Sequence, residues 1–334
     1  MEVGKLRNDC LQSAVIDAIK PIREDVLIRP SVGEDCGAIA FGDFACVLTT
    51  DPITGSGAHL GKLAVDVCVN DIASSGATPV GILLTLLCPV GTTTTEINGI
   101  LTQANAVANS MNIEILGGHT EITSAVNKIV VSATAIGKID KKMLIRTGGG
   151  KPEDLIYVTK SSGIEGTAII ATDKAIALKS VLSICEIEEA QNLIHQTSVL
   201  KEGIIGGRIG ASAMHDATEG GVIGAIHEVC EASGTGCSVS LSKFRILPVT
   251  EKICKHFNIE PLKLISSGAM VIVIAPSRAS ELERQLQTEG VDFACVGRLT
   301  EALDKVLIDD SDPRDVKELT IDMPESDELY KVVG

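Results

Sequence analysis

Two spacings of apolar residues alternate along the first half of the chain and predict a mixture of strands and helices. Between residues 36 and 137 they give the order strand, strand, helix, strand, helix, strand, strand, which is an α+β order with a mixed or antiparallel sheet. Strands are expected at 36–41, 45–50, 80–88, 113–116 and 128–137, and helices from about 65 and at 95–111. A short helix is expected at 10–19, with Asp9 as its N-cap, and a glycine-rich loop at 55–61.

A segment rich in Lys, Gly and Pro at 138–154 interrupts this pattern and predicts a domain boundary. We therefore expect an N-terminal domain at 1–150 and a C-terminal domain at 151–334, the second also α+β. Its expected strands cover 155–159, 238–241, 270–275 and 293–299, and its expected helices cover 186–196, 201–213, 221–232, 250–257 and 278–290. The stretch from 214 to 221 is expected to be a polar loop, and the tail after 309 a surface strand and a loose end.

Polar residues interrupt the apolar pattern of the helix near residue 65. Asn70 and Asp71 lie in a segment whose apolar residues fall on one helical face, although both residues lower helix propensity and a buried carboxylate is costly unless a cation or donor meets it. Two further acidic, glycine-rich segments occur at 33–37 and 117–121. Any one of them alone is more often a helix cap or a turn. Three in one half of the chain indicate a magnesium–nucleotide site.

Composition narrows the class of ligand. Hydrophobic residues make up 45% of the 334 residues and charged residues 22%, which is typical of a globular protein. Aromatic residues are only 2%, with no Trp, and the net charge is -15. With so few aromatic side chains, the protein offers little on which nucleic-acid bases could stack. An acidic protein also releases no counterions from the phosphates of a polyanion, so nucleic acid is not expected as a partner. Magnesium can still bridge carboxylates to the phosphates of a nucleotide.

Cysteine usage and hydropathy indicate the compartment. The ten cysteines include no Cys-x-x-Cys pair, and several lie in apolar patterns, which is typical of reduced, buried thiols. The first ten residues are polar, so no signal peptide is expected, and the apolar run at 79–90 is too short to span a bilayer. We expect a cytoplasmic protein with no membrane partner.

The acidic segments contain the residue types that a magnesium–phosphate site needs. Asp35, Asp51 and Asp71 have small neighbours that leave room for a phosphate, and magnesium takes oxygen ligands. Gly117 and Gly118 can bring backbone amides close to an anion. His119 follows with a group that titrates near neutral pH. His215 has no second His nearby, and we expect it to be a hydrogen-bonded loop histidine.

Six motifs stand in the order seen in the PurM-like, AIR synthase-related superfamily. They are residues 33–38 (GEDCGA), 50–52 (TDP), 69–73 (VNDIA), 76–77 (GA), 117–121 (GGHTE) and 216–221 (DATEGG). The chain resembles this superfamily over roughly 32–299, and within it most resembles the HypE carbamoyl dehydratases of nickel-iron hydrogenase maturation. The resemblance implies two α+β domains, with the N-terminal domains of two subunits pairing into a homodimer and ATP bound near the interface.

The resemblance also implies roles for individual residues. It assigns magnesium and phosphate binding to Asp35, Asp51 and Asp71, and a loop- or phosphate-holding role to Asn70. It places Gly117, Gly118, His119, Thr120 and Glu121 near the phosphates, and Asp216 and Glu219 in the cleft from the second domain. The residues carried over as catalytic are Asp71, His119 and Glu121, and the cofactors are ATP and Mg²⁺.

The implied reaction is activation of an amide- or carbamoyl-type oxygen by phosphoryl transfer from ATP. Two departures from the dehydratase pattern leave the acceptor open: the last cysteine of the sequence is Cys295, and Ser266-Ser267 precede Gly268 where an acidic residue is expected. The alternatives are a non-catalytic ATP-binding scaffold that docks to other maturation proteins, and a small-molecule kinase or synthetase of the same superfamily, such as a thiamine-phosphate kinase. The acceptor, the number of magnesium ions and the partner stay open.

Overall fold

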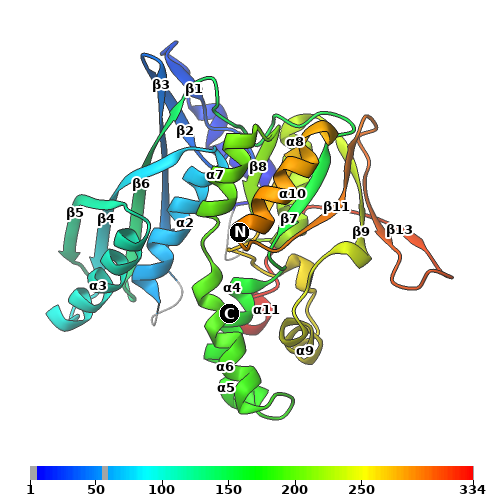
Figure 1. The fold of residues 1–334 in the computed structure, drawn as a ribbon. Helices are drawn as coiled ribbons and strands as arrows, with labels where there is room; N and C mark the ends of the chain where they lie inside the picture. The colour runs from blue at the N-terminus through cyan, green and yellow to red at the C-terminus, as the bar shows by residue number, and fades with distance from the viewer. Residues whose placement is uncertain (1–5, 55–58, 334) are drawn as a thin grey trace.

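The computed structural model describes residues 6–54 and 59–333, which form two sheets with helices packed against them (Figure 1). The fold is α+β, as predicted, and two-domain PurM-like. No helix in the described ranges is long and apolar enough to cross a membrane. Part of the glycine-rich loop expected at 55–61 lies outside the described residues.

The first sheet has six strands in the order β1-β2-β3-β6-β4-β5. The strands are β1 (Val26–Ile28), β2 (Gly37–Phe41), β3 (Phe44–Ile53), β4 (Thr78–Cys88), β5 (Glu114–Ile122) and β6 (Val130–Asp140). Helices α2 (Leu60–Ser74) and α3 (Thr94–Ser110) cover one face, where Val47 and Ala133 are fully buried (Figure 1). Thr93 and Glu96 form a capping box that starts α3. Among the described residues, no other helix makes extensive contact with these strands, so the opposite face of the sheet is not covered by a helix.

The second sheet has seven strands in the order β13-β12-β9-β11-β7-β10-β8. They are β7 (Leu155–Thr159), β8 (Ala213–Asp216), β9 (Gly236–Ser240), β10 (Met270–Ile274), β11 (Phe293–Thr300), β12 (Lys305–Asp309) and β13 (Lys317–Thr320). Helix α8 (Gly221–Ser233) packs on one face, and α7 (Leu200–Ile209) and α10 (Ala279–Thr288) pack on the other. Every residue of β10 is buried, because both of its faces are covered.

A third apolar cluster joins helices at one end of the second sheet. It is formed by α4 (Ile164–Asp173), α5 (Ala175–Leu178), α6 (Ile184–Asn192), α9 (Pro248–Phe257) and the C-terminal α11 (Tyr330–Val333). The N-terminal helix α1 (Asn8–Ala14) is short and contributes no buried residue.

Helix α2 lies between the two sheets and decides where the site forms. One side of it packs on β3, β4 and β6, and another side contacts α7 and β8. Glycines of α7 allow the close approach, since a Cβ on Gly203 would lie 2.3 Å from the carbonyl oxygen of Ala73. Thirteen of the fifteen residues of α2 are buried, so its polar residues are held inside the protein.

The structure corrects several predicted elements. The strand expected at 113–116 extends to Ile122, so 117–121 is strand and not loop, because β5 pairs with β4 over this length. Residues 213–216 form the buried strand β8 and not a loop, and α7 ends at Ile209. The first helix ends at Ala14 and its N-cap is Arg7, not Asp9. The surface strand expected after residue 309 is β13, and the expected loose end carries the short helix α11. Strands β1 and β12 were not predicted.

Candidate active site

Asp71 is a buried carboxylate that lies close to three others, Asp35, Asp51 and Asp216. It comes from α2, is 7% exposed, and its Oδ2 accepts a hydrogen bond from Thr49 Oγ1 at 2.5 Å. Burial raises the pKa of Asp71 well above its usual range, and the negative charges of Asp216, Asp51 and Asp35 raise it further. This carboxylate therefore requires either a proton or a cation.

Four separate elements supply this carboxylate group. Asp35 precedes β2, Asp51 lies on β3, Asp71 on α2, and Asp216 ends β8. A cavity of about 10 Å³ beside Asp35 and Asp71 has the size of one ion or water molecule. A cluster of carboxylate oxygens is the donor set that Mg²⁺ accepts, so the residues present fit a magnesium ion.

His215, next to Asp216 on β8, is held between two carboxylates. Its Nδ1 lies 2.8 Å from Asp35 Oδ2, and its Nε2 lies 2.9 Å from Glu228 Oε2 on α8. Burial alone would lower the pKa of His215, but Asp35 and Glu228 raise it well above its usual value. The histidine is hydrogen-bonded, as predicted, but it is a buried strand residue and not a loop residue.

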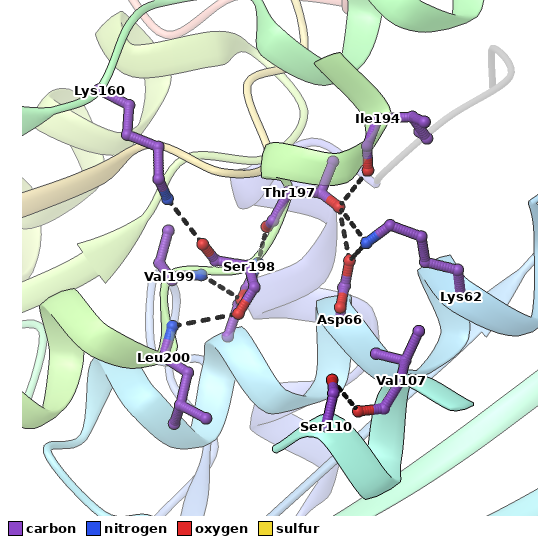
Figure 2. A network of polar contacts seen from close by, with 11 residues as sticks. Lys62, Asp66, Val107, Ser110, Lys160, Ile194, Thr197, Ser198, Val199 and Leu200 are labelled. Atoms are coloured by element: carbon purple, nitrogen blue, oxygen red, sulfur yellow. Dashed lines mark hydrogen bonds and ion pairs between the residues drawn. The ribbon is translucent and has the colours of Figure 1, made fainter. Parts of the chain in front are cut away.

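A row of polar side chains along α2 forms hydrogen bonds with the C-terminal half of the chain. Lys62, Asp66, Asn70 and Ser74 follow one another at four-residue intervals and so lie on one face. Thr197 Oγ1 donates to Asp66 Oδ2 at 2.5 Å, and Lys62 pairs with the same oxygen (Figure 2). Ser74 Oγ lies 3.3 Å from Asp216 Oδ1, which joins this row to the carboxylate group.

Asn70 and Lys160 hold the segment that follows Thr197. The Asn70 amide donates to the carbonyl oxygen of Thr197 at 2.8 Å and accepts from the backbone N–H of Val199 at 2.8 Å. Lys160 donates to the carbonyl oxygen of Ser198 at 2.6 Å (Figure 2) and pairs with Glu202 at 2.6 Å. Two roles were considered for Asn70, holding a loop and binding a phosphate. The geometry supports the first, because the side-chain nitrogen and oxygen both have backbone partners and the side chain is fully buried.

The 117–121 segment lies apart from the carboxylate group within one chain. Across the sheet, Gly118 on β5 is paired with Leu84 on β4, Leu84 with Ala133 on β6, and Ala133 with Asp51 on β3. Three strand spacings, about 14 Å, therefore separate Gly118 from Asp51. His119 and Glu121 are exposed on β5 at the edge of the sheet, 3.5 Å from each other. Their predicted catalytic roles, and phosphate binding by Gly117 and Thr120, are not supported by contacts within one subunit and stay predictions.

A second group of carboxylates, Glu165, Glu219 and Asp327, interacts electrostatically near the loop that precedes α8. Burial raises the pKa of Glu165, at the start of α4, to about 7, and a hydrogen bond with Ser267 offsets part of this rise. Burial likewise raises the pKa of Asp327 to about 6, although its Oδ2 accepts from the Gly220 N–H at 2.8 Å. Glu219 accepts from the Tyr330 hydroxyl at 2.8 Å. The C-terminal segment thus packs directly against the loop that precedes α8.

Sequence reasoning did not assign roles to Thr49, Glu165, Thr197 and Glu228. Thr49 lies on the inward face of β3, two residues before Asp51, and strand alternation would have indicated it. Glu228 follows His215 by thirteen residues on the next helix, and no local spacing predicts their contact.

The chain matches two family models and several curated proteins. Residues 33–139 match the family described as AIR synthase related protein, N-terminal domain, and residues 151–310 match AIR synthase related protein, C-terminal domain. A candidate hydrogenase expression/formation protein of Methanocaldococcus jannaschii is 27% identical over 333 residues, 96% of each chain. Carbamoyl dehydratase HypE of Rhodobacter capsulatus is 25% identical over 302 residues, 88% of this chain and 86% of its own.

Solved structures share the fold. A chain of the HypE–HypF complex superposes with a TM-score of 0.78 at 19% identity, covering 94% of this chain and 99% of that one. HypE in complex with ATP gives 0.69 at 17% identity, covering 99% and 97%. ThiL complexed with AMPPCP and TMP gives 0.71 at 16% identity, covering 92% and 96%. At these identities the likeness establishes the fold alone.

Proposed function

The chain belongs to the AIR synthase-related protein family, and from this premise we propose that it is an enzyme that uses Mg²⁺-ATP to transfer a phosphoryl group to an amide- or carbamoyl-type oxygen. The observation that carries the proposal is the burial of Asp71 among Asp35, Asp51 and Asp216. Four carboxylates this close together, two of them buried and two half-buried, are unfavourable without a cation. Bound Mg²⁺ would neutralise both them and the phosphates of ATP.

The residues of this chain would act mainly by positioning. Asp35, Asp51 and Asp71 would hold the magnesium ion, and Asp216 would close the group from the second sheet. Thr49 and Ser74 orient Asp71 and Asp216 through hydrogen bonds. Neutralising charge and aligning donor and acceptor supply most of the barrier lowering in phosphoryl transfer.

The type of acceptor is inferred from the relatives. Similarity to carbamoyl dehydratases favours a carbamoyl-type oxygen and a role in hydrogenase maturation. The likeness to ThiL keeps a thiamine-phosphate kinase activity as the second candidate. Incubation with ATP and either thiamine phosphate or a carbamoylated thiol, followed by detection of ADP, separates the two. ATP binding without turnover on either acceptor would favour the scaffold alternative.

We also propose a homodimer that pairs through the helix-free face of the first sheet. Leu83 and Leu116 are 37% and 54% exposed there, and β5 leaves its outer edge unpaired among the described strands. A second subunit would cover this apolar surface, and it could bring the 117–121 segment to the carboxylate group of its neighbour. A maturation protein is a further candidate partner, since HypE has been solved in complex with HypF.

Calorimetric titration of Mg²⁺-ATP tests the ATP site. We expect micromolar binding to the wild-type protein and its loss in Asp71→Asn. Asp43→Asn, which changes an exposed aspartate in the β2–β3 turn of the same sheet, is the matched control and should bind like wild type. Equal binding by Asp71→Asn and wild type would contradict the assignment.

A further inference from the structure

We propose that Asp35, His215 and Asp216 bind a first-row transition metal ion, with His215 as the nitrogen ligand and Glu228 as the residue that orients its ring. This site differs from the proposed magnesium site in containing an imidazole. It joins the two sheets, because Asp35 precedes β2 whereas His215 and Asp216 belong to β8.

The three side chains have the spacing of metal ligands. One potential ligand atom from each lies within 4.8 Å of the other two. Ligands held 2.0–2.2 Å from one ion stand about 3 Å apart when they are at right angles. His215 Nδ1 and Asp35 Oδ2 are already 2.8 Å apart. An ion between them therefore requires only small movements of side chains.

The contact between His215 and Glu228 supplies the feature that metal-binding histidines share. A histidine that binds a metal through one ring nitrogen almost always donates the N–H of the other nitrogen to a carboxylate, a carbonyl group or water. Here Nε2 faces Glu228 Oε2 at 2.9 Å, so the ring is fixed with Nδ1 directed at Asp35. The His215 side chain is only 3% exposed and the Glu228 side chain 10%, which keeps this orientation rigid.

The donor set selects the class of metal. Mg²⁺ prefers oxygen ligands and keeps several waters, whereas imidazole suits transition metals. One imidazole nitrogen with two carboxylates therefore favours a transition ion over Mg²⁺ at this position. In the absence of a metal, both ring nitrogens of His215 are paired with carboxylates, Nδ1 with Asp35 and Nε2 with Glu228. These contacts satisfy the polar atoms of the ring and explain how the imidazole stays buried.

The site shares Asp35 and Asp216 with the proposed ATP site, so the test measures metal binding directly and without nucleotide. Failure of this inference would leave ATP binding by Asp71 untouched. Loss of ATP binding alone would equally leave the metal site standing.

The experiment is titration of Mn²⁺ into the full chain, followed by electron paramagnetic resonance and electron spin echo modulation. We expect one bound Mn²⁺ whose modulation shows coupling to a ¹⁴N nucleus of imidazole. Co²⁺ should displace it at a lower concentration than Mg²⁺ does, because affinity for such sites rises from Mn²⁺ to Co²⁺. Bound Mn²⁺ without nitrogen coupling, or displacement by Mg²⁺ as readily as by Co²⁺, would overturn the proposal.

Three variants locate the ligand and its support. His215→Gln should abolish the nitrogen coupling. Glu228→Gln keeps the imidazole and should weaken Mn²⁺ binding by about 10- to 100-fold. His227→Gln, which changes the neighbouring half-buried histidine of α8, is the control and should leave both readouts unchanged. If His215→Gln does not fold, the nitrogen coupling in the wild type and the Mn²⁺ affinity of Glu228→Gln test the proposal. Unchanged Mn²⁺ affinity in Glu228→Gln would contradict the orienting role of Glu228.

Discussion

The Asn70 side-chain amide on α2 donates a hydrogen bond to the carbonyl oxygen of Thr197, 2.8 Å away, and so ties the first sheet's central helix to the segment that leads into α7. Its Oδ1 accepts from Val199 on the other side of Ser198. One side chain thus satisfies two buried backbone groups of a segment that forms no regular structure.

Replacing Asn70 by Ala should lower the free energy of unfolding by about 1–3 kcal/mol. The variant leaves the Val199 N–H and the Thr197 carbonyl without their partners, and an unsatisfied buried group costs this much. Urea unfolding followed by circular dichroism measures the change. Asn105→Ala, at an exposed position of α3, should change stability little. Equal stability of Asn70→Ala and wild type would show that the amide does not hold this segment.

The fold could be predicted where the hydrophobic period was unambiguous. The strand pattern of β3, the continuous apolar run of β4 and the helical spacing in α3 predicted these elements correctly. The strand β8 was missed because Met214, His215 and Asp216 read as a polar loop, although both faces of this strand are buried in the structure. Burial of a histidine and an aspartate depends on partners from α8 and α2, which no local pattern contains.

The candidate site was predicted in part. Asp35, Asp71 and Asp216 lie close together in the structure. The acidic segments that contain Asp35 and Asp71 were identified from the residue pattern, whereas Asp216 was included only through the resemblance to the superfamily. The 117–121 segment looked equivalent because it is also rich in glycine and acidic residues. Its place at the sheet edge depends on strand order, and the order β6-β4-β5 is not encoded in the composition of the segment itself.

Asp71→Asn should make the metal-free protein more stable at pH 8 while removing its stabilisation by Mg²⁺-ATP. The pKa of Asp71 is raised in the folded state, so the stability that the protonated carboxyl contributes is present at low pH and lost as pH rises through the folded pKa. The amide carries no charge and avoids that loss. Thermal unfolding with and without Mg²⁺-ATP measures both effects. A wild-type protein that is more stable than the variant in the absence of ligand would contradict this account.

Glu165→Gln should reduce the fall in stability between pH 4.5 and pH 7. The pKa of Glu165 is raised from 4.5 to about 7. The stability that protonated Glu165 contributes is therefore fully present below the pKa of the unfolded chain and is lost as pH rises through the pKa of the folded protein. The loss amounts to about 3 kcal/mol at most. Asp327, with a pKa raised to about 6, acts in the same direction and remains in the variant.

Urea unfolding at pH 5, 6, 7 and 8 compares Glu165→Gln with wild type. The difference in unfolding free energy should grow in favour of the variant across this range. Glu188→Gln, on the exposed side of α6, is the control and should follow wild type. Parallel curves for Glu165→Gln and wild type would mean that Glu165 ionises in the folded protein as readily as in the unfolded chain.

Leu83→Arg should convert the proposed homodimer to a monomer. Leu83 lies on β4 and its side chain alternates with the buried Ile82 and Leu84, so it faces the helix-free side of the first sheet. An arginine there would place an unpaired charge in an interface between two apolar faces, which costs several kcal/mol. Light scattering coupled to size-exclusion chromatography measures the mass. Ile176→Arg, which changes an 86% exposed residue of α5, controls for a general effect of surface charge and should leave the mass unchanged. A wild-type protein that elutes as a monomer, or a Leu83→Arg variant that remains dimeric, would remove this face from consideration and, with it, the route by which β5 could reach the carboxylates of a second subunit.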